Sequence, residues 1–192
     1  MVPAGVPHAF PLQLAESPVS PESMTTGLMS ARGTRAEELA AFAMQQTDDA
    51  TRLDRIVQAA SRRLGVAGVN VSVLTDRQIT VAGQTPDGSP AEVGYEVDFE
   101  DSICVNALRT DEPLAIPDTR ADARVSSIPA VSDGPIRSYL GSAIRTDVGV
   151  VAVLCVYDVR PRHWSERDIA QLSELAAEVR SELLRLASTS EG

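Results

Sequence analysis

The sequence has no lysine, only two histidines and two cysteines, and 4% aromatic residues. Without lysine the protein can form no lysine Schiff base, and it lacks the Gly-Lys step of phosphate-binding loops. His8 and His163 are too few for a multi-histidine metal centre. All 17 basic residues are arginines, and 27 acidic residues bring the net charge to −10. This charge argues against general nucleic-acid binding, because phosphate neutralisation needs clustered cations.

The proline distribution divides the chain into a tail and one domain. Residues 1–33 contain five of the twelve prolines, few charges and no apolar periodicity, which predicts a disordered tail. Residues 34–48 are predicted as an N-terminal helix or linker, 49–187 as the folded domain and 188–192 as a second tail. No stretch has the length of a membrane span or the pattern of a signal peptide. We therefore expect a cytoplasmic protein with reduced cysteines and with neither a membrane nor a nucleic acid as partner.

Two segments have the apolar spacing of amphipathic helices. In residues 53–64 the apolar side chains share one face and arginines occupy the other. The second helix starts at Ser165, an N-cap whose capping box Asp168 completes. Its apolar residues then repeat at spacings of three and four from Ile169 to Leu186. We expect part of this seam to pack on a sheet and the rest to face a second copy of the chain.

Alternating apolar and polar residues predict strands between these helices. Residues 69–73 and 79–82 read as a hairpin, and 84–97 as a loop. A short helix over 101–109, capped by Asp98 or Asp101, precedes a short strand at 114–116 and a long loop over 117–135. Two long strands follow, 138–146 and 150–157, the second apolar enough to be covered on both faces. Because hairpins make the longest connections, the fold class is α+β.

Three segments carry a distinctive combination of residues: DSICVNAL followed by DEPLAIPD within 101–118, YLGSAIR at 139–145, and VLCVYD with RPRHWS within 153–165. Together they resemble the middle of a bacterial GAF domain, over residues 50–187. The resemblance implies a sensory domain with a central antiparallel sheet, helices on one face and a loop-covered ligand pocket on the other. It also implies a homodimer through the first and last helices. It leaves the ligand or cofactor unspecified, because this fold hosts many small molecules.

The resemblance places the pocket between the short helix, the long loop and the strands that face them. The candidate ligand-binding residues carried over are Ser102, Cys104, Asn106, Asp118, Arg120, Arg124, Arg137, Tyr139 and Ser142. A loop arginine can hold an anionic group, while Asp118 and Asn106 can hydrogen-bond a ring. Arginine is the only cation available, so an anion would be held by one of these three arginines. The alternative is that Asp118 caps a turn, the arginines pair with nearby acids and Asn106 faces solvent.

The two cysteines allow a redox interpretation as well as a structural one. Cys104 on a helix and Cys155 on a facing strand could form a disulfide, or one could be a sensor thiol. The simpler interpretation is that both are buried small hydrophobes, and we expect the preceding aspartates to raise the pKa of Cys104.

Several ligand classes of the family fit the sequence poorly. His163 is expected at the surface rather than on a haem, and Val105 stands where bilin-binding relatives have a histidine after the anchoring cysteine. A lysine-free chain cannot match the Asn-Lys motif of cyclic-nucleotide-binding relatives. The free methionine sulfoxide reductases of this fold use three cysteines, and this chain has two.

We therefore expect a non-catalytic sensory domain that binds a small molecule and signals to a partner protein through its dimer helices. A ligand would close the loop of residues 117–135 and shift the packing of the helix over 165–187. The alternative is a ligand-free interaction scaffold with a filled pocket, which an inward Tyr139 or Ile136 would favour. Thiol-based redox sensing is a third possibility.

Overall fold

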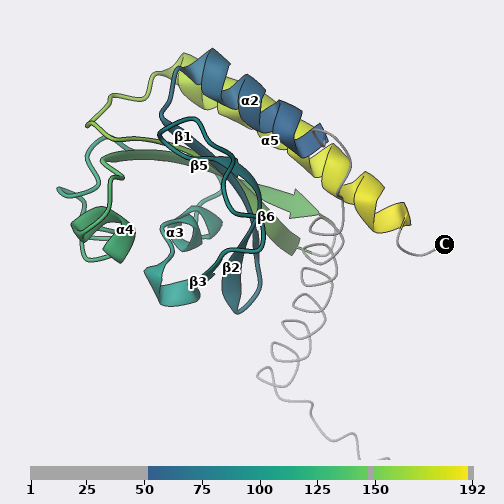
Figure 1. Ribbon diagram of the computed structural model, residues 1–192, viewed down its shortest axis with the longest axis horizontal. Coiled ribbons are helices and arrows are strands. Elements are labelled where there is room, and N and C mark those ends of the chain that lie inside the picture. The colour runs from purple at the N-terminus through teal and green to yellow at the C-terminus, as the bar shows by residue number, and fades with distance from the viewer. Residues whose placement is uncertain (1–51, 147–148, 190–192) are drawn as a thin grey trace, which may run out of the picture.

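Six antiparallel strands form one sheet at the centre of the computed structural model, which describes residues 52–146 and 149–189 (Figure 1). The strand order is β3-β2-β1-β6-β5-β4. The strands are β1 Gly68–Leu74, β2 Arg77–Gln84, β3 Glu96–Asp98, β4 Leu114–Ile116, β5 Ser138–Thr146 and β6 Gly149–Asp158. The α-helices are α2 Arg52–Leu64, α3 Cys104–Leu108, α4 Pro129–Ser132 and α5 Glu166–Thr189. The predicted α+β class is thus confirmed.

Helices α2 and α5 lie side by side on one face of the sheet, while α3 and α4 lie on the other (Figure 1). Residues on β1 alternate between these faces, as the two-residue period of a strand requires. Val69, Val71 and Val73 pack in the cluster under α2 and α5. Asn70 and Ser72 alternate with these valines and therefore belong to the opposite face. The predicted apolar strand is β6, which is hydrogen-bonded between β1 and β5. Its Leu154 and Cys155 belong to the two opposite clusters, so both of its faces are covered.

The apolar seam of α5 packs entirely on the sheet side. Ile169, Leu172, Ala176, Val179, Leu183 and Leu186 all lie in or against the cluster shared with α2. The expectation that part of this seam faces a second copy is therefore wrong, because the sheet and α2 together cover its full length. None of the described helices is long and apolar enough to span a membrane.

Three predicted boundaries differ from the structure. The short helix begins at Cys104 after a 3₁₀ turn, Phe99–Asp101, and neither predicted aspartate caps it. Instead, the Ser102 hydroxyl accepts the N–H of Cys104 at 3.1 Å. The end of the predicted loop over 84–97 contributes to β3, and α5 continues to Thr189. The predicted tail of residues 1–33 and the segment 34–48 lie outside the described residues.

The start of α5 is a complete capping box, as predicted. The Ser165 hydroxyl accepts the N–H of Asp168 at 3.2 Å, and the Asp168 carboxylate accepts the N–H of Ser165 at 2.9 Å. Two N–H groups that the first helical turn leaves without a helical partner are thereby satisfied.

Ser165→Ala should lower the free energy of unfolding by about 1 kcal/mol, because it removes one half of this capping box. Ser173→Ala is the matched control, since that mid-helix hydroxyl bonds only the carbonyl of Ile169 in its own helix. It should change stability by no more than about 0.5 kcal/mol. Urea unfolding followed by circular dichroism measures both, and equal effects would contradict the capping role.

Candidate functional site

A small cavity lies between the sheet and α3, on the face away from α2 and α5. Its volume is about 90 Å³. The strands supply Asn70, Gln78, Val97, Tyr139, Cys155 and Tyr157, and the cover supplies Asp101, Ser102, Ile103, Cys104, Ala130 and Ile136. The lining thus comes from β1, β2, β3, β5 and β6, the segment leading into α3, α4 and the residues before β5.

Two glycines make room for the two tyrosines of the cavity. Gly68 pairs with Tyr157 in the β1–β6 register, and a Cβ on Gly68 would meet the Tyr157 ring. A Cβ on Gly141 would likewise meet the ring of Tyr139, two residues away on the same face of β5. Both rings therefore lie over strand backbone that carries no side chain.

Hydrogen bonds connect the cover of the cavity to its strand wall. The Ser102 hydroxyl bonds Gln78 Oε1 on β2 and also accepts the N–H of Cys104, so it ties the start of α3 to the sheet. On the same wall, Asn70 Nδ2 donates to Thr80 Oγ1 at 3.2 Å.

Several buried polar atoms near the cavity have no hydrogen-bond partner among the described residues. These atoms are Asn70 Oδ1, the Tyr139 hydroxyl and the Ser72 hydroxyl. Leaving such a group unsatisfied costs about 1–3 kcal/mol. Asn70 and Tyr139 line the cavity, so a bound molecule or water can satisfy them there.

The thiols of Cys104 and Cys155 face one another, with their Sγ atoms 3.8 Å apart. The hydrogen bond between the two thiols lowers the pKa of Cys104, although burial opposes this shift. The pKa of Cys155 is raised well above its ordinary value, by its hydrogen bond with Cys104 and by burial. The expectation that aspartates raise the pKa of Cys104 is therefore wrong, because the groups in contact with the sulfur are hydrogen-bond donors.

Three of the nine predicted site residues line the cavity: Ser102, Cys104 and Tyr139. Of the others, Asn106 is half-buried and donates from Nδ2 to the carbonyl of Ile103 at 3.5 Å. Ser142 lies on β5 between Leu140 and Ile144, which pack under the helices. Its place in the strand alternation directs it to the opposite face of the sheet from Tyr139.

The remaining four predicted residues form contacts within the long loop instead of lining the cavity. Arg137 pairs with Asp118 at 3.2 Å, and its Nε has no partner among the described residues. Arg124 Nε donates to Asp122 at 2.9 Å, and Arg120 Nε donates to the carbonyl of Val131 at 3.2 Å. Asp118 also accepts the N–H of Arg120. Two of the three arginines thus pair with nearby acids, as in the alternative stated above, while Arg120 contacts a backbone carbonyl.

The strand wall of the cavity contains residues that the sequence reasoning missed. Asn70, Gln78 and Tyr157 are polar side chains on strands that are mostly buried. A polar residue at such a position is a detectable signal, because buried polar groups are uncommon without a partner or a ligand.

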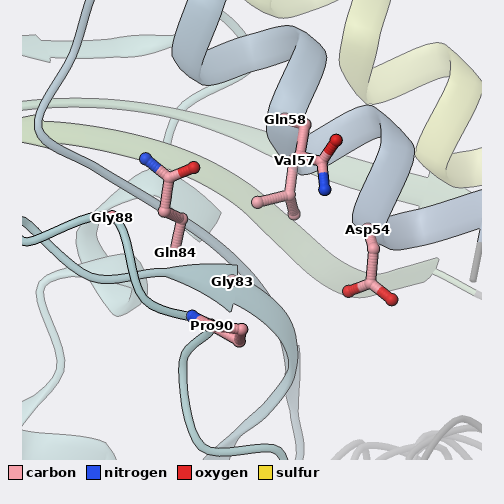
Figure 2. Close-up of a pocket in the computed structure, with 7 residues that line it drawn as sticks. All are labelled: Asp54, Val57, Gln58, Gly83, Gln84, Gly88 and Pro90. Atoms are coloured by element: carbon pink, nitrogen blue, oxygen red, sulfur yellow. The ribbon is translucent and has the colours of Figure 1, made fainter. Parts of the chain in front are cut away.

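A second hollow, of about 250 Å³, lies on the opposite face of the sheet between α2 and the loop after β2. Figure 2 shows Asp54, Val57 and Gln58 on α2 facing Gly83 and Gln84 on β2. Gln84 is satisfied by Ser61, to which its Nε2 donates at 2.9 Å. The loop residues that close this hollow, Gly88 and Pro90, are exposed. Although larger, it offers no unpaired buried polar atom among its described lining residues, so the cavity under α3 is the better candidate.

A six-stranded antiparallel sheet, with α2 and α5 on one face and a covered cavity on the other, defines the α+β class of this domain. The sequence profile of the GAF domain family matches residues 48–183. The chain belongs to the GAF domain family, whose members are generally sensory or regulatory ligand-binding domains.

Solved GAF structures share this fold at low sequence identity. The GAF domain of an Acinetobacter phosphoenolpyruvate-protein phosphotransferase is 15% identical, with a TM-score of 0.60 over 84% of this chain and 98% of that one. The blue-light absorbing PixJ GAF domain of Thermosynechococcus elongatus is 20% identical, with a TM-score of 0.60 over 82% and 92%. A free methionine-R-sulfoxide reductase from Neisseria meningitidis is 15% identical, with a TM-score of 0.57 over 84% and 93%. A search of curated proteins found no match.

The stability of the protein should fall at alkaline pH because of Tyr157. Burial raises the pKa of this phenol from 10 to about 12, so between these values the folded protein keeps a proton that the unfolded chain has lost. The stability that the protonated Tyr157 contributes to the folded state is therefore complete below pH 10 and is lost as the pH rises toward 12. Tyr157→Phe should reduce the loss of unfolding free energy between about pH 9 and about pH 11 by about 1 kcal/mol. An unchanged pH dependence in urea titrations would contradict this.

Gly141→Ala should lower the free energy of unfolding by about 1–3 kcal/mol, because the new methyl group overpacks the Tyr139 ring. The same substitution in a Tyr139→Leu background should cost less, since the ring is gone. A double-mutant cycle on urea unfolding measures this coupling. Equal costs in the two backgrounds would show that the glycine serves another purpose.

Proposed function

We propose that this GAF domain is a non-catalytic sensor that binds a small neutral molecule in the cavity under α3 and signals to a partner protein through α5. The observation that carries the proposal is the unpaired polar lining, in which Asn70 Oδ1 and the Tyr139 hydroxyl lack partners among the described residues. A ligand that hydrogen-bonds both groups recovers the cost of their burial.

The charges around the cavity favour a neutral ligand over an anion. Asp101 is the one charged side chain among the described residues that line the cavity. The three loop arginines that could hold an anion instead contact Asp118, Asp122 and the carbonyl of Val131. An anion would therefore meet the Asp101 carboxylate at the exposed end of the cavity and no cation among the described lining residues, which is unfavourable.

The volume of about 90 Å³ limits the ligand to a few non-hydrogen atoms. Pockets for drug-sized ligands are about 300–1,000 Å³. A larger ligand requires the cover to move, and Ala130 and Ile136 are the parts of the long loop that line the cavity. The position of this loop therefore depends on whether such a ligand is bound.

The long loop is linked by hydrogen bonds to the start of α5. The carbonyl of Pro117 accepts the N–H of Arg162 at 2.9 Å. Next to it, the Trp164 indole donates to the carbonyl of Ile116 at 3.3 Å. Arg162 also reaches Asp168 in the first turn of α5, at 3.4 Å. A shift of the loop on ligand binding thus reaches the N-terminus of α5 through contiguous contacts.

The homodimer remains part of the proposal, with a changed interface. Because the apolar seam of α5 is buried against the sheet, a second copy would contact the outer faces of α2 and α5. These faces carry exposed Arg55, Ala177 and Leu184, among others. The partner protein that receives the signal would bind α5 or the ends of the chain.

A ligand-free interaction scaffold is the second candidate function. The inward ring of Tyr139 and the half-buried Ile136 fill much of the space under α3, which favours this alternative. Catalysis of the reductase type is less well supported, because the resemblance ties that chemistry to three cysteines and this sequence has two.

Two measurements on the purified full chain test the proposal. Denatured protein is analysed by mass spectrometry for a released small molecule, and saturation-transfer NMR compares acetamide with acetate, a neutral and an anionic probe of the same shape. We expect acetamide to bind and acetate to bind at least about tenfold more weakly. Ala130→Leu, which fills the cavity, should abolish both the acetamide signal and any released molecule. Ala123→Leu, an exposed position in the same loop, is the control and should change neither.

The outcomes separate the two candidate functions. Acetate binding that exceeds acetamide binding would overturn the neutral-ligand proposal. The absence of both acetamide binding and a released molecule, in a protein with a normal melting transition, would favour the scaffold instead.

A further inference from the structure

The thiol pair in the cavity wall is a feature that ligand binding does not explain. Cys104 on α3 and Cys155 on β6 are the only two cysteines in the sequence. Each is 3% exposed, yet both line the cavity, and their Sγ atoms are 3.8 Å apart. The two sulfur atoms are thus already in van der Waals contact beside a space that a small molecule can enter.

We propose that this pair is an oxidation site, at which a small hydroperoxide entering the cavity converts the two thiols into a disulfide. The sulfur of Cys104 attacks the hydroperoxide, the O–O bond breaks, and Cys104 sulfenic acid and an alcohol (or water, from hydrogen peroxide) are formed. The sulfur of Cys155 then attacks Cys104 Sγ and the S–O bond breaks to release water. The two sulfurs lose two electrons in total, the peroxide gains them, and the two thiol protons leave on the two oxygens.

The surroundings of the sulfurs assign the two roles. Cys104 is the attacking group, because it lies close to the exposed Asp101 at the open end of the cavity, whereas Cys155 is held in the interior of the sheet. The lowered pKa of Cys104, caused first by its hydrogen bond with Cys155, agrees with this role. Cys155 Sγ lies 3.8 Å from Cys104 Sγ, next to the place where the sulfenic acid forms, and is therefore the resolving thiol.

Formation of the bond requires a modest movement of α3. A disulfide brings the sulfurs to about 2.05 Å, so they must approach by nearly 2 Å. Cys155 is held in the interior of the sheet, paired on both sides through Asn70 and Gly141. Cys104 belongs to a helix of five residues between two irregular segments, so α3 is the element that moves. Oxidation would therefore draw the cover onto the sheet and reduce the cavity.

The cavity provides the route for the oxidant. Asp101 in its lining is exposed and Val97 is half-buried, so the cavity reaches the surface near the start of α3. Hydrogen peroxide is about the size of two water molecules and fits a space of about 90 Å³. A bulkier hydroperoxide fits less well, which makes the rate dependent on the size of the oxidant.

The test treats the folded full chain with hydrogen peroxide, quenches it in acid and alkylates it under denaturing conditions. We expect the intact mass to fall by two hydrogen atoms with no alkylation, and a cross-linked peptide to join Cys104 to Cys155. Reduction should restore two alkylation sites. tert-Butyl hydroperoxide should react at least about tenfold more slowly than hydrogen peroxide with the folded protein, and the two should differ less with the denatured chain.

Two variants, with melting temperatures measured alongside, assign the order of events. Cys155→Ser should accumulate a sulfenic acid on Cys104 that dimedone traps, and Cys104→Ser should leave Cys155 at least about tenfold less reactive. Two free thiols in the treated wild-type protein, or a covalent dimer in place of the internal disulfide, would overturn the proposal. The acetamide measurement is independent of these thiol assays, so either proposal can fail alone.

Discussion

The two-residue alternation along the central strands is the constraint on which the rest of the structure depends. On β1 it directs three valines under the helices, while Asn70 lines the cavity on the other face. On β6 it assigns Leu154 to one layer and Cys155 to the other. A slip of one residue in register would exchange the two faces and put an asparagine under the helices. The core and the cavity are therefore two results of one register.

The elements formed by local patterns were predictable, and those formed by distant contacts were not. The hairpin of β1 and β2, the long strands and the capping box of α5 follow from neighbouring residues. The edge strand β3 is only three residues long and exists because β2 pairs with it. The cavity draws on five strands and their connections, so sequence reasoning reached Ser102, Cys104 and Tyr139 through a family resemblance. The prediction also placed Ser142 in the pocket with Tyr139. These residues are three positions apart on β5, so the two-residue period of a strand directs them to opposite faces of the sheet.

The edge strand β4 connects the two layers of the molecule. Ile116 packs in the cluster around α3, while the neighbouring Ala115 packs against the cluster under α2 and α5. The backbone carbonyl of Ile116 accepts the indole N–H of Trp164, whose ring lies in the helix-side cluster. The Arg162 guanidinium is 4.7 Å from the centre of that ring. A displacement on the cavity side is thus transmitted at the sheet edge and does not have to pass through the close-packed central strands.

The lack of lysine also influences the character of the cavity. A guanidinium is planar and always charged, and it pairs well with a carboxylate or carbonyl within reach. In the long loop Asp122 is two residues from Arg124, and Asp118 reaches Arg137 across the base of the loop. The Thr119 hydroxyl closes that base on the carbonyl of Ile136 at 2.7 Å. The cations are therefore used to hold the loop in shape. What faces the cavity is a wall of hydroxyls, amides and thiols, which suits a neutral ligand or a neutral oxidant better than an anion.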